Sequence, residues 1–243
     1  MLSLPEKYKK NASIPKNVFV RGAELAGADK KRFETWVESI HLKYQIEGFD
    51  IPNLVNDEYN CQVIMFIAIH IKELKQASFI AKIVQKCLPT LCIIEFTDGT
   101  DEVYSFADKR LNKLNEKEIV IENEYISTKL PLNYDNDLKT LFSLYIDYDT
   151  ILNRSNKHAY YVEMMTKAFL VCERGAYSQS DSILDNKKLW YDETRASQVF
   201  PLMKQIKTLK ETAAKAKSIA DRSEYNKKIR QTISELERLM HNE

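Results

Sequence analysis

The sequence predicts an α+β fold: a mostly antiparallel sheet with flanking helices, followed by a helical half that ends in an antiparallel, coiled-coil-like helical hairpin. Three observations lead to this class. Helix and strand patterns alternate in the first half of the chain, an Asp-Gly dipeptide joins two strands as a tight hairpin, and the second half is dominated by helical periodicity. We therefore expect an α+β domain at 1–132, a helical region at 133–200 and a C-terminal helical hairpin at 201–243.

The first elements are a helix and a strand. Asp29 is placed to cap a helix, and apolar residues follow at the spacing of one helical face: Phe33, Trp36, Val37 and Ile40. The next stretch, "HLKYQIEG" at 41–48, alternates apolar and polar side chains, which is typical of a half-buried strand.

A central strand comes next. The run "YNCQVIMFIAIHI" at 59–71 is apolar on both faces and rich in β-branched residues. Residues 76–88 return to helical spacing before Pro89, two strands flank Asp98–Gly99, and 118–128 form the last strand. Because neighbours joined as hairpins pair antiparallel, we expect a mostly antiparallel sheet with its helices on one side.

Beyond Pro131 the pattern becomes helical. Residues 136–154 and 158–175 carry the periodicity of packed helices, Gly175 is placed to end the second, and the polar stretch 176–186 indicates a loop.

The last 43 residues contain a heptad seam and, after it, a second apolar stripe. Between the seam and the stripe, Asp221 and Glu224 form a capping-box pattern, which favours a helical hairpin over one long helix. The single helix stays open as an alternative. We predict a partner interface at the seam and stripe residues Leu202, Ile206, Leu209, Ile229, Ile233 and Leu236.

Composition limits the class of protein. A chain of 243 residues with 44% hydrophobic and 29% charged residues is expected to fold rather than stay disordered. The net charge of +1 gives no overall field toward nucleic acid or an anionic membrane. The N-terminal stretch has no signal pattern and the longest apolar run is 63–69, so we expect a cytoplasmic protein without a membrane partner. The four cysteines have no C-x-x-C spacing, which suits reduced core residues.

The turn at Asp98–Gly99 gathers carboxylates. If these two residues form a two-residue turn, Phe96 faces Asp101 and Glu95 faces Glu102 across the hairpin. A divalent cation, Mg²⁺ or Mn²⁺, could lie between the two glutamates with Asp98 or Asp101 nearby. Alternatively, the glutamates reach into water or a bulge shifts the register.

Other polar residues suggest weaker sites. Asp57 and the triplet Glu73-Leu74-Lys75 resemble the acid and acid-x-lysine set of a metal-dependent nuclease. Lys109 and Arg110 end the second hairpin strand, where they could meet a phosphate or a carboxylate, although a basic pair at a strand end is usually solvated. His158 has no nucleophile beside it at a recognisable spacing.

Several stretches together resemble an uncharacterised bacterial family, the domain of unknown function DUF4391. They are "IPKNVF", "WVESIHLKYQIEGFDIP", "VIMFIAIHIK", "CLPTLCIIEF", "YSFADKRLN" and "EYNKKI". The family has no assigned active site, so the resemblance transfers no functional residues. It implies a setting in mobile or defence-type regions of bacterial genomes, often near helicases and DNA methyltransferases.

These observations favour a non-enzymatic accessory or interaction protein of a DNA-processing or antiphage-defence locus, which acts through protein contacts. By the resemblance the partner is a helicase or a DNA methyltransferase; self-association is the other possibility. No cofactor is expected in that case. The alternatives are a metal-dependent nuclease using Mg²⁺ or Mn²⁺, and a nucleic-acid-binding module without catalysis.

Overall fold

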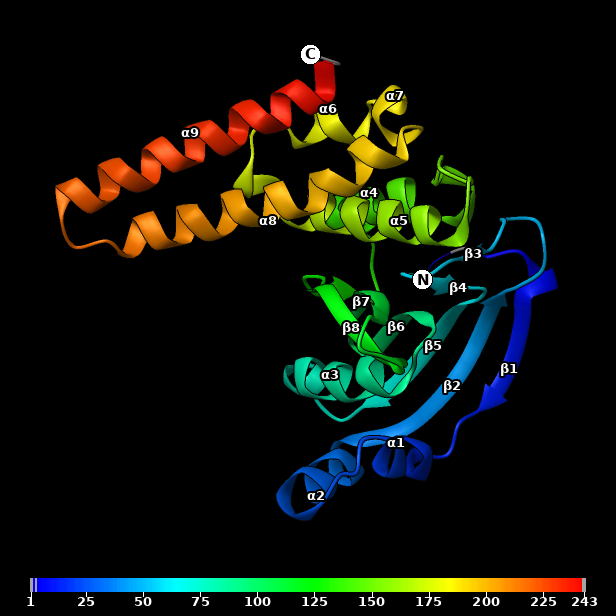
Figure 1. Ribbon diagram of the computed structural model, residues 1–243. Coiled ribbons are helices and arrows are strands. Elements are labelled where there is room, and N and C mark those ends of the chain that lie inside the picture. Colours follow the sequence, from blue (N-terminus) through cyan, green and yellow to red (C-terminus); the bar gives the residue numbers. More distant parts are fainter. Residues whose placement is uncertain (1, 3, 242–243) are drawn as a thin grey trace.

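A computed structural model describes residues 2 and 4–241, and it confirms the α+β class. The main sheet has the strand order β1-β2-β5-β6-β7-β8, with β9 paired to β7 (Figure 1). Its strands are β1 Lys9–Ser13, β2 Val37–Ile46, β5 Ile64–Ile71, β6 Leu91–Thr97, β7 Asp101–Asn112, β8 Asn115–Ile126 and β9 Leu130–Pro131. A small hairpin, β3 Leu54–Val55 and β4 Asn60–Cys61, stands apart from this sheet.

The sheet is antiparallel except at its centre. β5 and β6 run parallel, because helix α3 (Ala77–Cys87) carries the chain back over one face between them. The expected central strand is confirmed in β5, which pairs with β2 on one side and β6 on the other.

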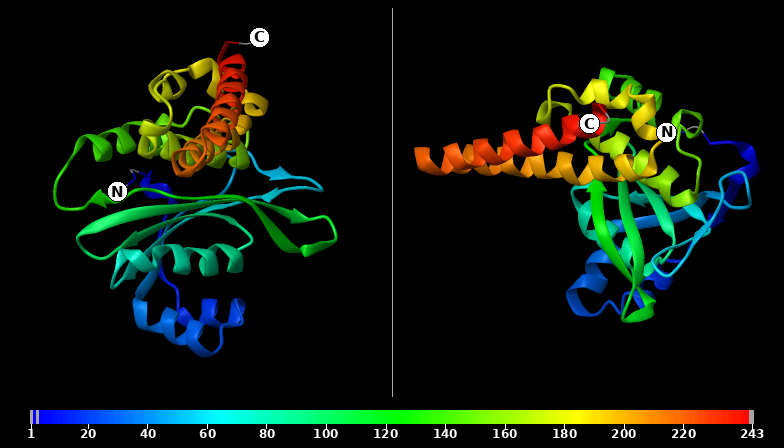
Figure 2. Two further views of the ribbon diagram at one scale, coloured as in Figure 1. Left: turned by 90° about the vertical axis from the view of Figure 1, so that its left-hand side faces the viewer. Right: turned by 45° about the horizontal axis from the view of Figure 1, so that its top comes forward.

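Helices cover both faces of the sheet, so the expected one-sided arrangement is wrong (Figure 2). Helices α1 (Lys16–Gly22), α2 (Gly27–Trp36) and α3 pack on one face, where Ile67, Ile69 and Phe96 join their core. The helical half packs on the other face against Ile93 and Phe106. The reason is visible in β6, which is buried on both faces and therefore needs apolar cover on each.

The first predicted helix ends earlier than expected. α2 ends at Trp36, and Val37 and Ile40 belong to the following strand, where both are buried. Asp29 lies in the first turn of α2, whose N-cap residue is Ala26. Two β-branched residues fit a buried strand better than a helix end, and here that preference prevails over the spacing.

The helical half contains a fully buried helix. All residues 157–171 of α5 (Lys157–Cys172) are buried, with α4 (Asp137–Ile146) and α8 (Glu193–Lys215) packed around it. The helix predicted at 136–154 ends at Ile146, and a short 3-10 turn follows at Tyr148–Thr150. A second 3-10 turn, Arg174–Ala176, follows α5. The expected loop at 176–186 is wrong, because α6 (Ser180–Leu184) forms there; α7 (Lys187–Trp190) follows.

The C-terminal hairpin is confirmed. α8 and α9 (Ile219–His241) lie antiparallel, and their turn places Ser218 so that its hydroxyl accepts a hydrogen bond from Asp221 N at 3.0 Å. Ser218 and not Asp221 therefore caps α9. α8 begins well before Pro201, which lies inside the helix. Within the described chain, no helix combines the length and apolarity needed to cross a membrane.

Candidate functional site

The hairpin of β6 and β7 does not have the expected register. Glu95 lies opposite Tyr104 and Glu102 lies opposite Thr97, so the predicted pairing of the two glutamates is wrong. The turn moves one residue along the chain, to Gly99 and Thr100, because the Asp98 carboxylate accepts hydrogen bonds from Thr100 N and Asp101 N. The two glutamates still share one face of the sheet as diagonal neighbours.

Glu95 lines a cavity of about 290 Å³ between the sheet and the N-terminal segment, together with Lys43 and Tyr104. Burial, and then the neighbouring Glu102 carboxylate, raise the pKa of Glu95. Burial and both carboxylates raise the pKa of the Tyr104 phenol well above its usual value. This face of the hairpin thus carries an acidic cluster in which Glu102 and Tyr104 are buried.

Replacing Glu95 by Gln is expected to raise the unfolding temperature at pH 7. The folded pKa of Glu95 lies above 4.5, so between 4.5 and that pKa the folded state holds a proton that the unfolded state releases. The stability from this group is complete below 4.5 and is lost as the pH rises through the folded pKa. The difference in unfolding temperature between the glutamine variant and the wild type should therefore disappear as the pH falls toward about 4. Thermal unfolding from pH 4 to 8 measures it, with the exposed Glu235→Gln as the control; a gain that does not depend on pH would contradict this account.

The residues predicted to hold a metal do not assemble. The Asp98 carboxylate is engaged in its own turn, where it accepts hydrogen bonds from two backbone amides. Across the described residues, no three His, Cys, Asp or Glu side chains come together in a way that could hold a metal ion.

The second acidic set is also dispersed. Asp57 lies in the β3–β4 turn before β5, whereas Glu73 and Lys75 follow the other end of that strand and pair with each other at the surface. Eight residues of extended strand, at roughly 3.3 Å each, separate the two ends by more than ~20 Å. The predicted nuclease triad is therefore not one site.

The basic pair has a structural role. Lys109 is 3% exposed, and its ammonium donates to Leu88 O and Thr90 O at 2.8 and 2.9 Å, so the expectation of a solvated pair is wrong for this residue. Burial lowers the pKa of Lys109. Arg110 pairs with Glu122 across the β7–β8 ladder. Lys109 closes the α3–β6 turn because its long side chain reaches carbonyls that end a helix.

The predicted interface residues lie inside the hairpin. Leu202, Ile206, Ile229 and Leu236 are buried, and Leu209 and Ile233 are partly buried. Leu202, Ile206 and Leu236 belong to the core between α8, α9 and the other helices, and Ile233 packs against it. A partner would consequently meet the outer faces of the hairpin.

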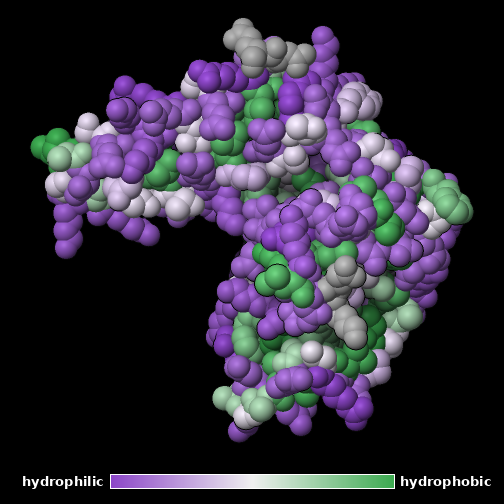
Figure 3. Space-filling view, in the orientation of Figure 1, coloured by the Kyte–Doolittle hydropathy of each residue, from purple (hydrophilic) through white to green (hydrophobic). Residues whose placement is uncertain are grey.

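We call residues 208–230, which form the distal part of the hairpin, the arm; it projects beyond the body in Figures 1 and 3. The arm carries seven Lys and Arg against three Asp and Glu, which leaves 29 against 32 in the rest of the chain. From Thr212 onward, the hydrogen bonds and ion pairs that the arm makes with other described residues all lie within the hairpin. At its tip, Ile219 is 87% exposed. The arm is thus a basic extension on a mildly acidic body.

A groove of about 420 Å³ lies at the base of the arm, between α8 and the layer of α3 and β8. Its floor includes Phe106, Tyr125 and Phe200, and its rim includes Lys82, Lys204, Lys207, Glu124, Glu173 and Glu211. An apolar floor within a mixed-charge rim is the composition of protein interfaces.

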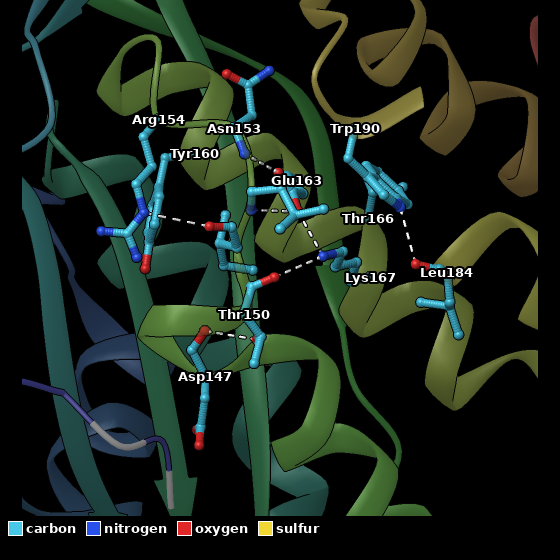
Figure 4. A network of polar contacts seen from close by, with 12 residues as sticks. Asp147, Thr150, Asn153, Arg154, Tyr160, Glu163, Thr166, Lys167, Leu184 and Trp190 are labelled. Carbon is cyan, nitrogen blue, oxygen red and sulfur yellow. Dashed lines mark hydrogen bonds and ion pairs between the residues drawn. The ribbon is translucent and has the colours of Figure 1, made fainter. Parts of the chain in front are cut away.

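Buried charges fix the loops around α5 (Figure 4). The Glu163 carboxylate accepts hydrogen bonds from Leu152 N and Asn153 N and pairs with Lys167 at 2.6 Å, while Lys167 donates to Thr150 O. Lys157, fully buried, donates to Gly48 O, Ile51 O and Asn53 Oδ1. These groups hold two loops against α5.

One pair of polar side chains was missed by sequence reasoning. His158 Nε2 lies 2.8 Å from Asp108 Oδ1, and both side chains are nearly buried. Asp108 belongs to β7 and His158 to α5, so no local spacing connects them.

Comparisons with known proteins give one match. Residues 2–236 match the family described as Domain of unknown function (DUF4391). No curated protein and no solved structure matches the chain.

Proposed function

The chain belongs to the DUF4391 family, whose function is unknown, and we propose that it is an interaction protein that docks on an acidic protein partner through its arm. The main support is that the apolar seam of the hairpin is already filled, while the basic outer faces of the arm project from the body. Complementary charge across an interface speeds association and selects the partner.

Several features favour a protein over a nucleic acid as the partner. Three acidic residues are interspersed among the seven basic ones on the arm, as in the pair Lys228–Glu224, and an exposed apolar residue stands at the tip. The groove at the base adds an apolar floor, which a protein side chain can fill. The family setting points to a helicase or a DNA methyltransferase of a DNA-processing or antiphage-defence locus as the partner.

Shortening the arm is expected to abolish partner binding while the body stays folded. Deleting 209–215 and 219–225 together removes one heptad from each helix, which keeps the seam in phase and retains the turn at 216–218. A second variant, Lys215→Glu with Lys227→Glu and Arg230→Glu, keeps the length and reverses the charge. The matched control reverses Lys30, Lys31 and Lys113, which are exposed and lie outside the arm.

Affinity capture from cells that carry the native gene, with and without added nuclease, measures the effect. We expect one protein partner to be retained by the wild type and the control and lost by both arm variants. Capture that survives arm shortening would refute the proposal.

Nucleic-acid binding is the second candidate, because the arm has a net charge of +4. It predicts capture that disappears with nuclease. It also predicts binding of a fluorescent DNA oligonucleotide with an affinity that falls steeply with salt and weakens in the charge-reversed variant.

A further inference from the structure

The imidazole of His158 is held on one side by a carboxylate. Asp108 lies where the β7–β8 register shifts, so its side chain turns toward the first turn of α5. An ionised carboxylate can only accept a hydrogen bond, so the Nε2 atom carries the proton in this pair. The other ring nitrogen, Nδ1, is then the one with a lone pair when the ring is neutral.

His158 lines a pocket of about 400 Å³, and Nδ1 is the ring nitrogen that its bond to Asp108 leaves for that pocket. Nδ1 makes no hydrogen bond with any described residue. It is also not fully enclosed by protein, so a molecule in the solvent can reach it. The pocket is lined by His158 and by polar side chains from three other segments: Asn56, Tyr59, Asn153, Thr194 and Ser197. Its volume is that of a small-molecule site.

The walls of this pocket are fixed in place. Tyr59 packs against the imidazole with ring centroids 4.2 Å apart and the ring planes tilted by 38°. Burial, followed by the Asp108 charge, raises the pKa of the Tyr59 phenol, which keeps it protonated. The Glu163 carboxylate holds the backbone of Asn153, and Lys157 holds the loop that leads into the β3–β4 hairpin. A histidine oriented by a carboxylate within rigid walls is the arrangement of a general base.

The lining also limits the ligand. No Lys or Arg side chain of the described chain lines the pocket, whereas the Glu193 carboxylate does. A phosphate or another anion would therefore find no countercharge there.

We propose that this pocket binds a small neutral or cationic polar molecule, and that His158 takes a proton from its hydroxyl or amine group at Nδ1. The proton moves from the ligand heteroatom to Nδ1, and the imidazolium that forms is stabilised by the Asp108 carboxylate through Nε2–H. This activity is independent of the arm and goes beyond the docking function.

The ester p-nitrophenyl acetate is a neutral probe of this nitrogen. A water molecule attacks the acetyl carbon while His158 takes its proton at Nδ1, which yields acetic acid and expels p-nitrophenolate, and the imidazolium then returns the proton to solvent. We expect His158→Gln to release p-nitrophenolate about tenfold more slowly or worse than the wild type, since general-base groups contribute roughly 10²–10⁴ in rate. Asp108→Asn should slow the release as well, because it no longer fixes the tautomer.

Two further variants make the test decisive. His70→Gln removes a half-exposed histidine outside the pocket and should keep most of the rate. Ser197→Trp leaves the His158–Asp108 pair intact and fills the exposed side of the pocket, so it should slow release even if His158→Gln fails to fold. Release at the wild-type rate in folded Ser197→Trp or folded His158→Gln would overturn the proposal.

Discussion

Replacing Lys167 by Met is expected to lower the free energy of unfolding by about 3–5 kcal/mol, the cost of leaving a buried charge without its partner. The side chains of Lys167 and Glu163 are 3% and 1% exposed, and their closest atoms are 2.6 Å apart. The methionine keeps the length of the side chain but leaves the Glu163 carboxylate without its cation. Urea unfolding followed by circular dichroism measures the change.

The double variant Glu163→Gln with Lys167→Met separates charge from packing. It removes both charges, so it should recover part of the stability lost in Lys167→Met, although the glutamine accepts only one of the two backbone hydrogen bonds well. The exposed pair Lys228–Glu224 is the matched control, where Lys228→Met should cost no more than about 0.5 kcal/mol. Equal losses at the two lysines would show that Lys167 is not buried in solution.

Local periodicity was enough to predict the elements that carry most of the sheet. The strand β5 was predictable from a short run of apolar, β-branched residues, and the helix α3 from apolar residues at helical spacing. The parallel pairing of β5 and β6 was not, because it depends on where α3 carries the chain and not on the strands themselves. The helices of the second half were predicted, but their packing on the other face of the sheet was not, because it depends on contacts between distant segments.

The hairpin register shows how side chains overrule a dipeptide rule. An Asp-Gly pair usually occupies both central turn positions. Here Thr97 Oγ1 accepts from Gly99 N while Asp98 Oδ1 accepts from the next two amides, and these bonds place Asp98 before the turn. A shift of one residue in the turn was enough to move Glu102 from Glu95 to Thr97.

The candidate sites depend on contacts that no sequence window contains. His158 and Asp108 lie 50 residues apart, and the carbonyls that bind Lys157 lie more than 100 residues before it. Charged residues inside α5 resemble a solvated helix face in the sequence. Only the loops folded over that helix supply their partners. The basic arm, by contrast, could be recognised from the charges of the last residues alone.

Replacing Leu236 by Ala is expected to detach α9 without unfolding the sheet. Leu236 is fully buried in the core that joins α9 to α8, and a Leu→Ala change in such a core costs about 2–5 kcal/mol. α9 is the last element and is held mainly by α8. The substitution therefore lowers the free energy needed to open α9 locally, and not that needed to unfold the sheet. Hydrogen exchange of α9 amides should speed by about thirtyfold or more, since 1.4 kcal/mol is a factor of ten.

The same measurement tests how the arm is supported. Exchange in β5 should stay unchanged, and the exposed Arg238→Ala should alter neither segment. Hydrogen bonds from Asn186 to Met240 O and from Arg195 to Leu239 O hold only the end of α9, so they cannot replace the seam along its length. If α9 and β5 instead speed up together in Leu236→Ala, the hairpin and the sheet unfold as one unit. Arm shortening would then weaken the body as well, and the lost partner in that variant could no longer be assigned to the arm surface.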